Sequence, residues 1–68
     1  MNQIMITFNQ QIRWVTSNYC LQRLLEEQTM PLVYAVAVNG KFVSKAQYAH
    51  YLLQAEDVVA VLTPMQGG

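Results

Sequence analysis

Few side chains of this 68-residue sequence could carry out chemistry, and they stand far apart along the chain. Cys20 is the one thiol and His50 the one imidazole. No serine, histidine and aspartate lie in a context that predicts a catalytic triad, and no glycine-rich loop is present to hold a phosphate. A single cysteine excludes an internal disulfide and the usual zinc ligand sets. We therefore expect a protein that is not itself an enzyme and that has no cofactor or metal of its own.

The remaining chemical feature is the pair Gly67 and Gly68 at the end of the sequence. Glycine has no Cβ, so these residues could pass through a narrow active site and present the Gly68 carboxylate to a reagent such as ATP. The six residues 63–68 extend to at most about 20–22 Å, enough to enter a site that a globular body cannot. Taken alone, the pair could equally be a tag remnant or a frayed end.

Composition limits the classes of partner. Hydrophobic residues make up 53% of the chain and charged residues 12%, and four basic residues balance four acidic ones. This balance predicts neither a nucleic-acid-binding surface nor, without a long apolar run, a membrane span. The first residues lack the pattern of a secretion signal, and we expect a cytoplasmic location. With so few charges to cover it, part of the surface must be apolar, which favours docking on protein partners.

The first third of the chain predicts a hairpin. Residues 4–8 alternate between apolar and other side chains with the period of a half-buried strand. Residues 9–11 form a polar break, and residues 12–15 are predicted as the returning strand. Because large aromatic side chains dominate the burial of small domains, Trp14 is predicted to lie in the core.

A helix is predicted next. Residues 16–18 offer three candidate N-caps, and Leu21, Leu24 and Leu25 form an apolar stripe of helical period. Cys20 would then lie in the first helical turn. We interpret it as a small, semi-buried residue without a chemical role, although a thiol at that place could in principle be activated.

The second half predicts three more strands, at residues 33–38, 41–43 and 58–62, with an Asn39-Gly40 turn between the first two. Residues 44–51 are predicted as a helical turn or an irregular crossover. Two hairpin-like ends around one helix indicate an α+β fold, a mixed sheet with the helix across one face. The whole chain, residues 1–68, is predicted to be a single domain, because one small core is all that this length allows.

These features resemble the ThiS family, the sulfur carrier proteins of thiamine biosynthesis. The resemblance covers essentially the whole chain, and the glycine pair is its one chemically specific part. The other matching segments are core spacings and turns: Phe8-Asn9, Leu24-Leu25, Ala37-Val38-Asn39, Gln47-Tyr48, Asp57-Val58-Val59. The resemblance implies the ubiquitin-like β-grasp fold with a flexible tail at residues 63–68.

The resemblance also implies a reaction and its partners. An E1-like adenylating enzyme (ThiF-like) would adenylate the Gly68 carboxylate, with Gly67 beside it. A sulfur donor system such as a cysteine desulfurase would convert the adenylate to a thiocarboxylate. A thiazole synthase (ThiG-like) would then take the sulfur for ring formation. Three alternatives stay open: the small subunit of molybdopterin synthase, a ubiquitin-like modifier that forms isopeptide bonds, and a non-catalytic interaction domain.

One departure and one surface can be examined in a structure. Glu56 stands where the family commonly has glycine, so a positive φ there would store about 1–2 kcal/mol of strain. Alternation along the strands separates a bulky set, predicted to face the helix, from a set with small residues, predicted to line an open, partner-binding face. The bulky set is Tyr34, Val36, Val38, Val59 and Val61. The predicted partner-binding residues are Ala35, Ala37, Ala60, Leu62 and, in the tail, Met65.

Overall fold

A computed structural model describes residues 2–28, 30 and 33–63 of the chain. All five predicted strands are confirmed, although the third begins at Ala35 rather than at residue 33, and the crossover contains a 3-10 helix. The elements in chain order are β1 (Gln3–Phe8), β2 (Gln11–Thr16), α1 (Leu21–Glu26), β3 (Ala35–Val38), β4 (Lys41–Val43), η1 (Lys45–His50) and β5 (Val58–Leu62).

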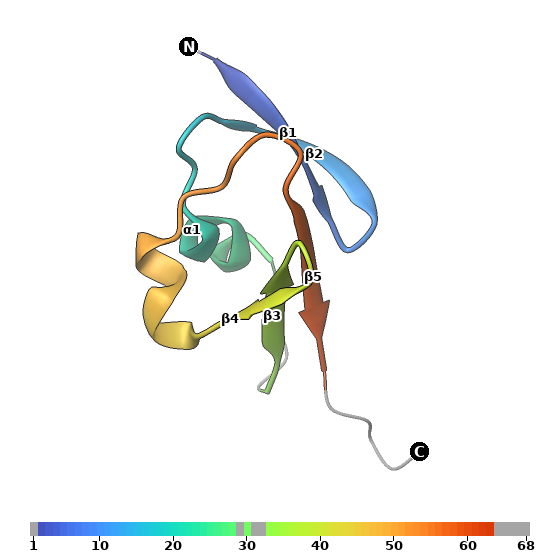
Figure 1. The fold of residues 1–68 in the computed structure, drawn as a ribbon, viewed down its shortest axis with the longest axis vertical. Helices are drawn as coiled ribbons and strands as arrows, with labels where there is room; N and C mark the ends of the chain where they lie inside the picture. The colour runs from blue at the N-terminus through green and yellow to red at the C-terminus, as the bar shows by residue number, and fades with distance from the viewer. Residues whose placement is uncertain (1, 29, 31–32, 64–68) are drawn as a thin grey trace.

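The strands form one mixed sheet, as the element pattern predicts, and their order in it is β2-β1-β5-β3-β4. β5 lies at its centre, parallel to β1 and antiparallel to β3, while β1–β2 and β3–β4 are antiparallel hairpins. α1 and η1 lie together on one side of the sheet (Figure 1). The last described strand in chain order therefore lies at the centre of the sheet, between β1 and β3.

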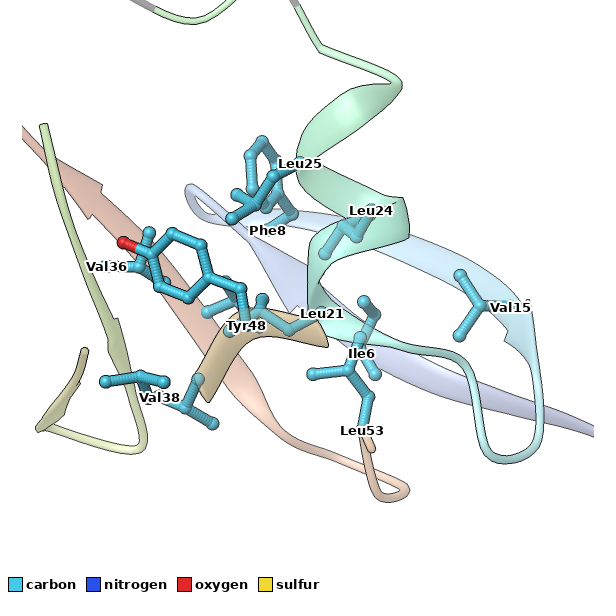
Figure 2. Close-up of a cluster of buried hydrophobic side chains, with 12 residues drawn as sticks. Ile6, Phe8, Val15, Leu21, Leu24, Leu25, Val36, Val38, Tyr48 and Leu53 are labelled. Carbon is cyan, nitrogen blue, oxygen red and sulfur yellow. The ribbon is translucent and has the colours of Figure 1, made fainter. Parts of the chain in front are cut away.

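The core lies between the sheet and this helical layer. Leucines of α1 meet the inward side chains of the strands, with Tyr48 of η1 and Leu53 closing one side (Figure 2). The buried cluster consists of Ile6, Phe8, Val15, Leu21, Leu24, Leu25, Val36, Val38, Val43, Tyr48, Leu53 and Val59. Of the bulky set predicted to face the helix, three valines are buried, and Tyr34 and Val61 pack against the cluster half-buried. That part of the prediction is confirmed.

The prediction that Trp14 lies in the core is wrong. Its side chain is 63% exposed, on the side of the sheet away from α1. The reason is register. The loop between β1 and β2 holds two residues, not three, so Phe8 pairs with Gln11 and Met5 with Trp14. A shift of one residue moves every side chain of a strand to the opposite face, so Arg13 and Val15 point inward instead. The Arg13 guanidinium lies 5.7 Å from the centre of the Phe8 ring.

The predicted caps at residues 16–18 are also wrong. The N-cap residue is Cys20, without a side-chain capping bond, so this thiol precedes the first turn instead of lying in it. A tertiary contact satisfies the helix start: the Leu21 N–H donates to the Tyr51 carbonyl at 2.8 Å. A bridge between Cys20 and Leu52 holds the two segments together. A backbone carbonyl of the crossover thus accepts a hydrogen bond from the first turn of the helix, as a capping side chain does in other helices.

Positive φ angles mark the turns. Asn9 and Gln10 (φ 49° and 70°) form the first hairpin loop, and Asn39 and Gly40 (φ 54° and 84°) the second. Two-residue loops with both φ angles positive are type I′ turns, whose twist matches that of the flanking strands. Glu56 has φ 69°, which is the positive φ at which strain of about 1–2 kcal/mol is expected for a residue other than glycine. Among the described residues, no helix is long and apolar enough to cross a membrane.

Candidate functional site

β5 is the element that leads into the predicted reactive end of the chain. It ends at Leu62, and the structure describes one further residue, Thr63. Met65, Gly67 and Gly68 lie outside the described residues, so their predicted roles stay predictions. The structure does show how the strand before them is held, and that is the part of the candidate site that can be built from contacts.

The start of β5 is fixed by a polar cluster around Asp57, which is only 7% exposed. One carboxylate oxygen accepts from the Asn39 side-chain amide at 2.9 Å, and the other accepts from the Gln54 N–H at 2.8 Å. Asn39 also exchanges two bonds with Val58: its N–H donates to the Val58 carbonyl, and its Oδ1 accepts the Val58 N–H. Each polar group of the cluster has a partner, so burial of the carboxylate is compensated. The sequence indicated only a turn at Asp57.

The predicted partner-binding residues of the sheet do come together. Ala37 pairs with Ala60 and Ala35 with Leu62, on the face away from α1. Leu62 is 47% exposed, and Ala35 and Ala60 are half-buried. Ala37 is only 8% exposed, so a partner would contact it little.

This open face is larger than the sequence predicted. Since side chains alternate along a strand, the outward positions of the hairpins extend it on both sides. Phe42 of β4 pairs with Ala37 of β3, and Trp14 of β2 pairs with Met5 of β1. The large exposed apolar side chains of the face are Ile12, Trp14, Phe42, Val58 and Leu62. A two-residue loop at residues 9–10 was the signal that would have placed Ile12 and Trp14 here.

The other chemical candidates are not assembled into a catalytic group. Cys20 is half-buried, as predicted, and its Sγ lies 3.3 Å from each of two acceptors, the carbonyls of Tyr48 and Ala49. His50 is exposed at the end of η1. Burial raises the pKa of the Tyr48 hydroxyl above its ordinary value. Across residues 2–28, 30 and 33–63, no group of three or more His, Cys, Asp or Glu side chains could hold a metal ion.

Comparison with known proteins agrees with this geometry. The family model described as "ThiS family" matches residues 3–68. No curated protein matches the chain by sequence. A crystal structure of the thiamine biosynthesis protein ThiS from Geobacter metallireducens is similar in fold, with a TM-score of 0.80 and 20% identity. The match covers 96% of this chain and 100% of that one. The mixed sheet with its short helix is therefore a β-grasp fold, as predicted.

Proposed function

The chain belongs to the ThiS family of sulfur carriers in thiamine biosynthesis, and we propose that it carries sulfur as a thiocarboxylate on Gly68. The supporting observation is where the chain's reactive groups lie: none are gathered in the described part, and the glycine pair follows the central strand in sequence. Among the described residues, no group of side chains that could hold a metal ion is assembled, whereas the central strand of the sheet ends at Leu62, shortly before the glycine pair in the sequence. The family match extends to that pair at residue 68. It favours thiamine biosynthesis over the molybdopterin alternative.

The chemistry needs three steps at the terminal carboxyl group. First, a Gly68 carboxylate oxygen attacks the α-phosphorus of ATP on an E1-like enzyme, and pyrophosphate leaves. Second, a persulfide sulfur attacks the acyl carbon of this adenylate, and AMP leaves. The resulting acyl disulfide accepts two electrons from a thiol, which releases the thiocarboxylate and forms a new disulfide with that thiol. The carrier supplies only a carboxylate that reaches the enzyme, and its lack of Cβ atoms at residues 67 and 68 permits close approach.

The open face of the sheet is the proposed docking surface for the adenylating enzyme and for the thiazole synthase. It is apolar, it lies on the strand that leads to the tail, and it is unpartnered by any described segment. Burial of such a surface favours association at about 25 cal/mol per Å² before the costs of association are subtracted. The small side chains at positions 35 and 60 would let a partner approach the sheet closely.

Intact-mass spectrometry tests the terminus. After incubation with ATP, the cognate adenylating enzyme, a cysteine desulfurase, cysteine and a thiol, the carrier should gain the mass difference between sulfur and oxygen. A variant with one residue added after Gly68 should not, because the carboxylate is then displaced by about 3.5 Å. An unchanged mass of the natural chain with active enzymes would overturn the proposal.

A matched pair of surface variants tests the docking face. Leu62 and Leu52 are both 47% exposed, but Leu52 lies in the crossover beside Cys20. Leu62→Arg should weaken binding to both partners at least tenfold with an unchanged thermal melt, whereas Leu52→Arg should not. Equal affinities for the two variants would place the docking surface elsewhere.

A cysteine variant tests whether the thiol takes part in sulfur transfer. Cys20→Ala and Cys20→Ser should be loaded with sulfur as the natural chain is, because the Cys20 thiol is committed to backbone carbonyls. A variant that melts normally but cannot be loaded would make Cys20 part of the relay.

A further inference from the structure

β5 loses its neighbour on one side before it ends. β1 pairs with it only at Thr7–Val58 and Phe8–Val59, and then turns away into the first hairpin. The last backbone bond from this side is the Asn9 N–H to the Val59 carbonyl, at 2.9 Å. In Figure 1, β5 continues well past the β1–β2 turn. On its other side β3 remains paired as far as Leu62.

One side chain extends the support beyond that point. The Oδ1 of Asn9 accepts the Val61 N–H at 2.8 Å. In a regular parallel ladder, the N–H at Val61 would bond to the backbone carbonyl of residue 9. Because Asn9 has turned into the hairpin with φ 49°, its side-chain carbonyl takes the place of the backbone one. Asparagine suits the position twice, since it tolerates positive φ and carries an acceptor on a short side chain.

The bond between Asn9 and Val61 lies close to the point where the chain leaves the sheet, so a small change there could have a large effect further along the chain. Seven residues lie between Val61 and the end of Gly68, and such a segment spans at most about 25 Å. If such a segment is held extended in a partner's active site, a change of about 10° in the direction in which it leaves the sheet would displace its tip by about 4 Å. Misplacement of a reacting group by even about 1 Å is costly for an enzyme-catalysed step.

We propose that Asn9 is a positioning residue for the reactive end: its side-chain bond to Val61 sets the course of the chain toward the adenylating enzyme. Asn9 does not touch the reacting atoms, and it acts through β5. This inference rests on the proposed function, since it concerns the delivery of the Gly68 carboxylate.

Three full-length variants separate the side-chain bond from the turn. Asn9→Gly keeps the positive φ but removes the acceptor. Asn9→Asp keeps both the tolerance of positive φ and an acceptor oxygen. Asn18→Gly is the matched control, because Asn18 also has a positive φ (64°) but lies in the exposed loop before α1.

Two measurements are made on each variant: amide hydrogen exchange at Val61 by NMR, and carrier-dependent ATP–pyrophosphate exchange by the cognate adenylating enzyme. Asn9→Gly should lower Val61 protection about tenfold and lower kcat about three- to tenfold, the range of one lost hydrogen bond. The KM for the carrier should stay within twofold, because the open face is intact. Asn9→Asp should restore both values, and Asn18→Gly should alter neither.

The outcomes distinguish the two proposals. If the natural chain supports no ATP–pyrophosphate exchange with an active enzyme, the proposed function fails and this inference fails with it. If the natural chain is active and Asn9→Gly loses Val61 protection with kcat unchanged, only the positioning role is overturned. Unchanged Val61 protection in Asn9→Gly, or a rise in KM alone, would overturn it as well.

Discussion

The two hairpins of this protein are built alike and anchored differently. Each has a two-residue loop that begins with asparagine at positive φ, Asn9 in one and Asn39 in the other. Both asparagines donate their backbone N–H to a β5 carbonyl and accept a β5 N–H at Oδ1. The difference is the third bond: the side-chain amide of Asn39 donates to the buried Asp57 carboxylate.

The second loop position differs too. Gly40 carries the positive φ of the β3–β4 turn without steric cost, whereas Gln10 carries it in the β1–β2 turn against its Cβ. The β3–β4 hairpin is thus bonded to the buried Asp57 carboxylate and carries less strain, and it fixes the start of β5. The β1–β2 hairpin is strained and tied by fewer bonds, and it supports the end of β5. More hydrogen bonds therefore hold β5 at its start, where the chain enters the sheet, than at its end, where the chain leaves it.

Removal of the buried carboxylate should have the largest effect. Asp57→Ala leaves the Asn39 amide and the Gln54 N–H without acceptors, and we expect a loss of about 2–4 kcal/mol in the free energy of unfolding, measured by urea denaturation. Glu56→Ala is the control, because its neighbouring carboxylate is exposed, and it should stay within about 0.5 kcal/mol. Equal losses for the two variants would deny Asp57 its anchoring role.

Exchange of each asparagine for glycine compares the two anchors directly. Both variants keep the positive φ and lose the side-chain bonds. Asn39→Gly should cost about 2 kcal/mol, because it also leaves the Asp57 carboxylate short of a donor. Asn9→Gly should cost about 0.5–1 kcal/mol, one exposed hydrogen bond. Chemical denaturation that ranked the two in the opposite order would reverse the comparison.

The comparison also shows what the sequence could and could not predict. Strand periodicity placed all five strands, because alternation of apolar side chains depends only on local spacing. Trp14 was predicted to be buried because large aromatic side chains usually are, but its face depends on the length of one loop. A break at residues 9–11 would put Trp14 inward, whereas the two-residue turn puts it outward. The sequence contained Asn-Gly in the second hairpin but only Asn-Gln in the first, so the shorter loop was the less obvious choice.

Features that depend on contacts between residues far apart in the sequence could not be predicted. The start of α1 is satisfied by the Tyr51 carbonyl, and no local capping pattern predicts a bond across that distance in sequence. The contact between Asn9 and Val61 joins residues far apart along the chain in the same way. The residues of the proposed docking surface could be placed on one face in part, since parity along β3 and β5 is local. Their extension to Trp14 depended on the hairpin register.

Substitution of the glycine in the second turn should have a smaller effect than loss of the Asp57 carboxylate. Gly40→Ala places a Cβ on a residue with φ 84°, and no described heavy atom lies within 4 Å of that position. The cost is therefore conformational alone, about 1–2 kcal/mol. Urea denaturation measures it. A loss well above this range would point to a steric contact in the turn.

The reverse substitution in the first turn should stabilise the protein. Gln10 has φ 70° and an exposed side chain, so Gln10→Gly removes left-handed strain of about 1–2 kcal/mol. Glycine also gives the unfolded chain more freedom, which offsets about 0.5–1 kcal/mol. The net gain should be about 0.5–1 kcal/mol, a rise of roughly 2–8 °C in Tm for a domain of this size. The matched position Gln11 is the first residue of β2, also exposed, and Gln11→Gly should lower the Tm because glycine weakens a strand. A fall in Tm for Gln10→Gly would mean that the two turns differ in more than strain.

The gain in stability of Gln10→Gly should come without loss of the Asn9 bond, so Val61 amide protection should be kept or increased in this variant. A more stable hairpin that no longer protected Val61 would show that the strain in the turn is what brings the Asn9 side chain to β5.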